Sequence, residues 1–352
     1  MRRLMILLAV LIALTCTVAA YEPPQDFTDL TLEQVMADFM DSNQLAEQNF
    51  SISYYNTVTG ESYAFNDEKF AIAASTYKLP LNMYFYEMER DGEITGDTLI
   101  TWTGQTLDYI HEQSIVNSNN ELSEALMYYW GDHTSYKEHM RKYFTMTDEE
   151  IDPLYYQGNY YCVRMMMDCL HYLYDNSGDF EELLGYMKIA KPGEYFKAGV
   201  TEYEVAHKYG AVQSFVNDVG IIYTPQPFLL AVYTQGIYGD GVCAEAAKLL
   251  TAYTVWQGEH MPEPEPPESD APTEAPAAEE ELTVALVPPV QETPAAEEAP
   301  AEPVEPSPAE DPPAETQSSE AASLFPLFLA VLAILFLICF LLRLLRIRKK
   351  AS

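Results

Sequence analysis

The chain has 352 residues, and its 54 acidic against 19 basic side chains give a formal net charge of −35. A chain this acidic offers no basic face to a phosphate backbone, which argues against a role in binding nucleic acid. Residues 21–260 suffice to bury the core of one domain, whereas the two ends have compositions of their own.

The N-terminus has the layout of an export signal. Met1-Arg2-Arg3 is a charged beginning, residues 4–14 form an apolar run, and Val18-Ala19-Ala20 supplies the small residues of a cleavage site. We therefore expect residues 1–20 to be a signal peptide and the remainder of the chain to be exported.

The first part of the expected domain combines helices with a hairpin. Apolar spacing predicts a helix over residues 32–48, with Thr31 as a possible cap. Strand-forming residues at 51–55 and 62–65 flank a turn-rich segment, which is typical of a β-hairpin. Another helix is expected over residues 75–89, because Asp91-Gly92 follows and breaks the pattern.

The middle of the chain is expected to be helical and its end to return to strands. Helix-spaced apolar residues cover 107–116, 120–130, 136–143 and 163–174. Strand-like runs rich in Val, Ile, Tyr and Phe cover 206–215, 219–224 and 228–233, and a last helix is expected over 242–255. Strands at both ends with helices between them predict an α+β fold, an antiparallel sheet flanked by helices with an inserted helical subdomain.

Three short motifs carry reactive side chains in this framework. Ser75 and Lys78 are three residues apart at a helix start, so they share a face and the amine can reach the hydroxyl. Ser118-Asn119-Asn120 and Lys208-Tyr209-Gly210 follow later in the chain. Each motif alone has a plainer interpretation, as a helix cap with a solvated lysine, an ordinary helix start, and a charge on an edge strand.

Together the motifs resemble the S-x-x-K, S-D-N and K-T-G set of the class A β-lactamase and penicillin-binding family. The likeness extends over about residues 49–256 and implies the serine β-lactamase-like fold. It implies that Ser75 attacks a carbonyl, that Lys78 accepts its proton, and that Ser118 passes a proton to the leaving nitrogen. Lys78 needs a lowered pKa for this task, which burial and a second cation, Lys208, would provide.

The resemblance also implies how a substrate is held. Asn120 would bind the amide of its side chain, and Lys208 would attract its carboxylate. The backbone N–H groups of Ser75 and of Ala211, the residue after Gly210, would form an oxyanion hole.

The sequence departs from the family pattern at several points. Asn119 replaces the middle Asp of the second motif, and Tyr209 replaces the small hydroxyl residue of the third. The E-x-x-L-N segment that supplies the family's deacylating carboxylate does not occur between Ser118 and Lys208. Glu149, Glu150 and Asp152 are nearby acids without that pattern, and a solvated acidic loop is their expected identity. An acyl-enzyme would therefore persist, so β-lactam hydrolysis is expected to be slow.

No cofactor or metal is expected. The six histidines lack ligand spacings such as H-E-x-x-H. Of the cysteines in the expected domain, Cys162 and Cys169 lie seven residues apart in one helix, about 10 Å along its axis, too far for a disulfide. With Cys243 the count is odd, so no complete disulfide framework is expected, and we interpret Cys162 and Cys169 as core thiols.

The C-terminal part indicates a stalk and a membrane anchor. Residues 261–322 contain no Lys or Arg and are rich in Pro, Ala and Glu, as disordered linkers are. Residues 323–342 are long and apolar enough for a transmembrane helix. The basic residues that follow, within 343–352, predict a cytoplasmic tail by the positive-inside rule.

These observations predict a single-pass protein of the cell membrane whose monomeric ectodomain, residues 21–260, is an extracytoplasmic serine hydrolase. Ser75 would be acylated by a β-lactam or by a peptidoglycan-like peptide. Two alternatives remain, a D,D-peptidase of the cell wall and a catalytically weak module that binds a wall component or another ligand on the same fold.

Overall fold

The computed structural model describes residues 21–260 of the chain. Within that range, no helix combines the length and the apolar character that crossing a membrane requires. The predicted signal peptide, stalk, transmembrane helix and cytoplasmic tail lie outside the described residues and stay predictions.

A five-stranded antiparallel sheet organises the domain, in the order β2-β1-β9-β8-β7. The two N-terminal strands are β1 (Phe50–Asn56) and β2 (Ser62–Phe65), and the three C-terminal ones are β7 (Val205–Val212), β8 (Phe215–Ile222) and β9 (Phe228–Gln235). Strands from both ends of the chain thus pair, with Ile52 opposite Val232. The predicted α+β class is confirmed, and β7 is one edge of the sheet.

The sheet is buried on both faces. Along β9, Leu229, Ala231 and Tyr233 pack into one hydrophobic core, whereas Leu230 and Val232 pack into another. This alternation follows from the two-residue period of a strand. Because both faces of the sheet are buried, the sequence of β9 is a continuous apolar run and does not alternate between apolar and polar residues.

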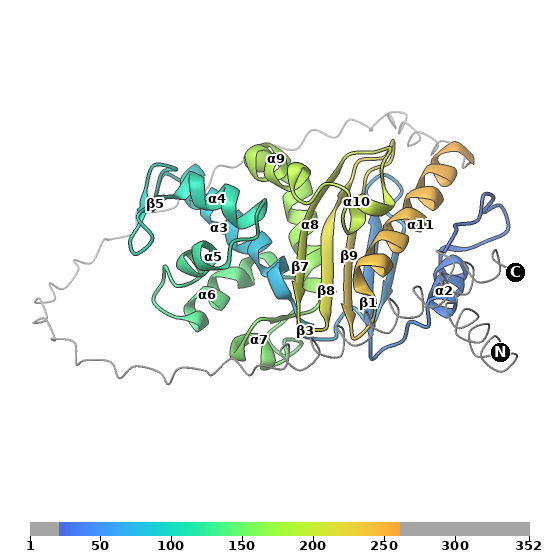
Figure 1. Cartoon of the computed structure of the whole chain (residues 1–352), viewed down its shortest axis with the longest axis horizontal. Coiled ribbons are helices and arrows are strands. Elements are labelled where there is room, and N and C mark those ends of the chain that lie inside the picture. Colours follow the sequence, from blue (N-terminus) through green and yellow to red (C-terminus); the bar gives the residue numbers. More distant parts are fainter. Residues whose placement is uncertain (1–20, 261–352) are drawn as a thin grey trace, which may run out of the picture. The chain divides into compact units, whose positions relative to one another are not determined.

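Helices cover the two faces. The core with Leu230 is closed by α2 (Leu32–Ser42) and α11 (Gly239–His260). The core with Leu229 is closed by α3 (Lys78–Arg90) and α8 (Val163–Asp175). Figure 1 shows α11 lying along the sheet, with α4, α5 and α6 gathered beyond the β7 edge.

The inserted subdomain consists of short elements. Its helices are α4 (Leu107–Ile115), α5 (Asn120–Met127), α6 (His133–Met140), α7 (Leu154–Gln157) and α9 (Glu181–Ile189), and α10 (Phe196–Gly199) leads back to the sheet. Three 3-10 turns are η1 (Ala74–Tyr77), η2 (Arg141–Tyr143) and η3 (Ser177–Phe180). Two small ribbons pair β3 (Ala71–Ile72) with β6 (Tyr160–Tyr161), and β4 (Leu99–Ile100) with β5 (Gln105–Thr106).

Several predicted boundaries were wrong. The helix expected from residue 75 begins at Lys78, after a 3-10 turn, and the last helix spans Gly239–His260 rather than 242–255. The first helix ends at Ser42, several residues earlier than expected. The predicted break between strands at 216–218 is instead part of β8, and the turn lies at Gln213, whose φ is 51°. Asn217 and Asp218 stay in the strand because their side chains have buried partners, the Ile72 carbonyl at 2.9 Å and His207 Nδ1 at 2.8 Å.

The cysteines agree with the sequence-based interpretation. Cys162, Cys169 and Cys243 are all buried and free. Burial raises the pKa of the Cys162 thiol to about 12, so it stays protonated at neutral pH. All three thiols pack within the hydrophobic cores.

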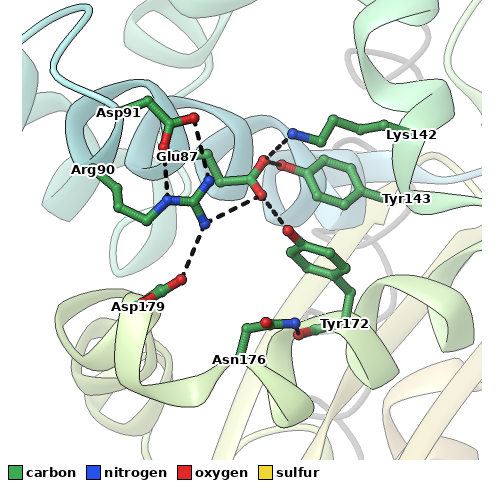
Figure 2. Close-up of polar contacts among 8 residues, drawn as sticks. All are labelled: Glu87, Arg90, Asp91, Lys142, Tyr143, Tyr172, Asn176 and Asp179. Atoms are coloured by element: carbon green, nitrogen blue, oxygen red, sulfur yellow. Dashed lines mark hydrogen bonds and ion pairs between the residues drawn. The ribbon is translucent and has the colours of Figure 1, made fainter. Parts of the chain in front are cut away.

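A buried carboxylate ties the helical subdomain to the sheet-covering helices (Figure 2). Glu87 on α3 is 3 % exposed. It accepts hydrogen bonds from the Tyr143 hydroxyl at 2.5 Å, from Lys142 Nζ at 2.6 Å and from the Tyr172 hydroxyl. One side chain therefore joins α3, η2 and α8, and its loss would leave two tyrosine hydroxyls without their acceptor.

We predict that Glu87→Ala lowers the free energy of unfolding by about 3 kcal/mol, because the buried Tyr143 hydroxyl and the half-buried Tyr172 hydroxyl lose a charged acceptor. Glu182→Ala is the matched control, since Glu182 is exposed and also accepts from two tyrosine hydroxyls, at 2.9 and 3.1 Å. It should cost less than about 1 kcal/mol. Urea denaturation measures both, and equal losses would show that the Glu87 cluster does not stabilise the fold.

Candidate active site

Ser75 lies in the 3-10 turn η1, between the ribbon strand β3 and helix α3. Thr76 anchors the turn to the core. Its buried hydroxyl donates to the Ala73 carbonyl at 2.8 Å and contacts the Tyr233 hydroxyl at 2.6 Å. Ala74 has a φ of 50°, a strained value for a residue with a Cβ. The result is a half-buried serine presented at the wall of a cavity.

Lys78 is the first residue of α3 and is fully buried. Its Nζ donates to the Ser118 carbonyl at 2.7 Å and to Asn120 Oδ1 at 2.8 Å. The Ser118 hydroxyl and the Asn119 carbonyl are each 3.3 Å away. The predicted meeting of the first two motifs is therefore present, and the amine holds the start of α5 in place.

Ser118 connects the second motif to the third. Its Oγ accepts from Lys78 Nζ at 3.3 Å and from Lys208 Nζ at 3.0 Å. A hydroxyl has two acceptor positions and one O–H donor. With both acceptor positions taken by lysines, the Ser118 hydrogen is left to point at a third group. Ser118 also has a φ of 53°, a strained conformation of the kind found at functional sites.

Asn119 belongs to the second motif, which was interpreted both as an ordinary helix start and as part of a catalytic site. Its side chain caps α5 by accepting from the Leu122 N–H at 3.0 Å. The segment is thus an ordinary helix start and, through Ser118 and Asn120, part of the site.

Burial lowers the pKa of both lysine side chains. It lowers the pKa of Lys78 to about 7, with the carboxylate of Glu124 offsetting part of that effect. It lowers the pKa of Lys208 well below the ordinary value, and the positive charge of Lys78 adds to the decrease. Lys78 therefore supplies a substantial fraction of neutral amine at neutral pH, as a base requires.

Lys208 does not lie at the cavity surface. It is fully buried in β7, and its Nζ lies 4.0 Å from the centre of the Tyr209 ring. That ring is stacked on Tyr195 at 5.0 Å. Because the Tyr209 ring packs against the buried amine, Lys208 supports Ser118 in this structure and does not line the cavity.

Gly210 allows the sheet edge to touch the serine turn. A Cβ placed on Gly210 would lie 2.5 Å from the Ser75 amide nitrogen and 3.0 Å from the Ala74 Cβ. Since β7 is the edge strand, alternate N–H groups along it do not pair with β8. The Ser75 amide and the exposed Ala211 thereby come to the same corner of the cavity, as an oxyanion hole requires.

The cavity measures about 250 Å³. Its lining includes Ser75, Asn120 and Ala211 from the predicted site, and it also includes Glu124 and Asn159, which the sequence analysis missed. Glu124 follows Asn120 by one helical turn, so a search for polar residues on that face of the helix would have found it. Asn159 ends the segment Tyr155-Tyr156-Gln157-Gly158-Asn159, which matches E-x-x-L-N only at its last position.

The three acids considered earlier are not in this lining. Glu149, Glu150 and Asp152 are exposed, and Glu150 accepts from the Thr147 N–H at 2.7 Å. They form the solvated loop that the sequence indicates. Among residues 21–260, no three His, Cys, Asp or Glu side chains are grouped so as to hold a metal ion.

Comparison with known families agrees with this geometry. A family model described as the beta-lactamase enzyme family matches residues 31–254. The chain belongs to this family. No curated protein matches it. The three motifs, their spatial order and the cavity thus occur in a β-lactamase-like domain, and the fold inferred from the motifs is confirmed.

Solved structures with this fold are distant in sequence. A variant of the last common ancestor of Gram-negative bacteria β-lactamase class A has 18 % identity and a TM-score of 0.54, covering 63 % of this chain and 97 % of that one. PBP-A has 17 % identity and a TM-score of 0.52, covering 63 % and 96 %. A PBP-A mutant, solved as an acyl-enzyme complex with penicillin G, has 17 % identity and a TM-score of 0.53, covering 66 % and 99 %.

We predict that Gly210→Ala reduces the rate at which a fluorescent penicillin labels the protein by at least about 100-fold, because the new methyl group separates β7 from the Ser75 amide. Gly185→Ala is the control, since a Cβ there meets nothing within 4 Å. Labelling is followed in gels, with circular dichroism to confirm folding. Unchanged labelling of a folded Gly210→Ala protein would contradict the oxyanion-hole assignment.

Proposed function

We propose that this protein is an extracytoplasmic serine hydrolase that forms an acyl-enzyme through Ser75 with a β-lactam or a peptidoglycan-like peptide. The observation that carries the proposal is the Ser118 hydroxyl held between two buried lysine amines, next to a cavity that Ser75 lines. A purely structural role would not require two lysines with lowered pKa values around one hydroxyl.

The acylation step follows from these positions. Ser75 Oγ attacks the carbonyl carbon of the substrate while Lys78, as the neutral amine, accepts the hydroxyl proton. The oxyanion that forms is bound by the N–H groups of Ser75 and Ala211. When the C–N bond breaks, Ser118 donates its proton to the leaving nitrogen and receives one from Lys78. The acyl group ends on Ser75, and both Ser118 and Lys78 return to their starting protonation states.

The residues around the cavity are suited to bind an amide group of a substrate. They are less suited to bind a substrate carboxylate. Asn120 is exposed at the cavity and presents an amide for hydrogen bonding. Lys208 is covered by Tyr209, so attraction of a carboxylate is weaker than an open lysine would provide. The penicillin G complex of a PBP-A mutant supports β-lactam acylation on this fold. Hydrolysis of the acyl-enzyme is proposed to be slow, and a D,D-peptidase is the alternative enzyme.

The covered Lys208 also motivates a non-enzymatic candidate, a module that binds a wall component or another ligand in the same cavity without acylation. Reversible binding and covalent labelling distinguish the two. A binding module would retain a fluorescent penicillin only until denaturation, whereas an acyl-enzyme keeps it.

We predict that Ser75→Ala abolishes covalent labelling by a fluorescent penicillin, and that Lys78→Ala slows it by a factor of about 10³ or more, because the nucleophile and its base are removed. Ser214→Ala, at an exposed turn residue, should label as the wild type does. Labelling is measured after denaturation, so that only the covalent adduct counts. Equal labelling of wild type and Ser75→Ala would refute the acyl-enzyme.

We further propose that residues 323–342 anchor the protein in the cell membrane and that residues 261–322 serve as a stalk between the anchor and an external domain. The apolar run, the basic residues after it and the Pro- and Glu-rich composition before it support this topology. A wall substrate requires the domain to lie outside.

We predict that a protease added to intact, wall-stripped cells cuts within residues 261–322 and releases a folded fragment that still reacts with penicillin, because extended polar segments are cleaved readily. Immunoblotting of the supernatant measures the release, and a cytoplasmic marker protein that stays uncut is the control. Release only after the membrane has been permeabilised would contradict the proposed orientation.

A further inference from the structure

We propose that Glu124 is the general base that activates water to hydrolyse the acyl group from Ser75. This inference rests on the proposed function, because it concerns the second half of the same reaction. It assigns the deacylating carboxylate to helix α5, whereas the family pattern places it in an E-x-x-L-N segment.

The first argument is the position of Glu124. It lies one helical turn after Asn120 on α5, so both side chains lie on the same side of that helix. Both line the cavity that Ser75 lines, and Glu124 is the one carboxylate among the residues described as lining it. Its charge reaches the catalytic amine, since it raises the pKa of Lys78 against the effect of burial.

The second argument is an unused acceptor in the same cavity. Asn159 Nδ2 donates to the Ala74 carbonyl, next to Ser75, at 2.7 Å. Its Oδ1 is buried and has no hydrogen-bond partner within the described residues. Asn159 therefore ties the cavity wall that it shares with Glu124 to the backbone beside Ser75.

The three acids and the tyrosine near the missing motif are not placed to act as this base. Glu149, Glu150 and Asp152 do not line the cavity. In the segment that ends at Asn159, Tyr155 occupies the position of the Glu in the E-x-x-L-N pattern. Tyr155 is fully buried, and its hydroxyl donates a hydrogen bond to the Lys137 carbonyl at 2.9 Å. Burial also raises the pKa of Tyr155 well above its ordinary value, so it stays protonated.

The step balances with groups that are present. Glu124 accepts a proton from water as the water oxygen bonds to the ester carbon of the acyl-enzyme. The resulting oxyanion reforms the carbonyl and breaks the bond to Ser75 Oγ. Glu124 passes its proton to the neutral Lys78 amine, and the Lys78 ammonium then donates a proton to that oxygen. The products are a free carboxylic acid and the original serine, and the one co-reactant is water.

The test uses purified full-length protein and penicillin G. Rapid denaturation followed by intact mass measurement gives the rate at which the adduct forms and the rate at which it decays. In Glu124→Gln the decay should slow about 100-fold, while formation changes less than about threefold. Glu124→Asp should recover part of the decay rate. Glu121→Gln is the matched control, because Glu121 is exposed on the same helix, as Glu124 is, but lies outside the cavity lining.

The outcomes separate this inference from the function on which it rests. If no adduct forms on the wild-type protein, the proposed acylation is wrong. If the adduct forms and decays equally in wild type and Glu124→Gln, the acylation stands and the assignment of Glu124 is overturned. Slower formation with unchanged decay would also overturn it, because Glu124 would then act in substrate binding.

Discussion

The site depends on one hydroxyl that accepts hydrogen bonds from two buried lysines. Ser118 Oγ lies 3.3 Å from Lys78 Nζ and 3.0 Å from Lys208 Nζ, and the three side chains come from three separate parts of the chain. Two amines this close, both shielded from water, cannot both hold a proton without a large penalty. Their mutual repulsion and burial keep neutral amine available, and the shared hydroxyl gives the proton a route from one side of the site to the other.

The edge strand β7 and the helical subdomain bring these groups together. The edge strand β7 carries Lys208 and Gly210, and the absence of a side chain at Gly210 lets that strand contact the turn of Ser75. The helical subdomain brings Ser118 to the same corner through the start of α5. The positive φ angles of Ala74 and Ser118 show that this convergence needs strained backbone, which the Thr76 and Asn119 hydrogen bonds hold in place.

Much of this was predictable from sequence, because strand and helix periodicities and the order of three motifs are local properties. The structure brings Lys78, Ser118 and Lys208 together and places Ser75 in the turn before Lys78, and the catalytic roles inferred from the motif order stay predictions. Glu124 could have been found from its spacing of one helical turn from Asn120, but only once Asn120 had been placed at the cavity. The covering of Lys208 was missed because Tyr209 stacks on Tyr195, which lies beside a short helix that no apolar pattern indicates. Contacts between distant segments decide these features.

The central claim is that Lys78 acts as a neutral base because burial lowers its pKa. The most direct test is the rate of adduct formation with penicillin G as a function of pH. Below the pKa the neutral fraction falls tenfold per pH unit, so the rate should rise with pH and level off above about 7. A rate that continues to rise toward the ordinary lysine pKa of about 10.4, or one that does not depend on pH, would contradict the account.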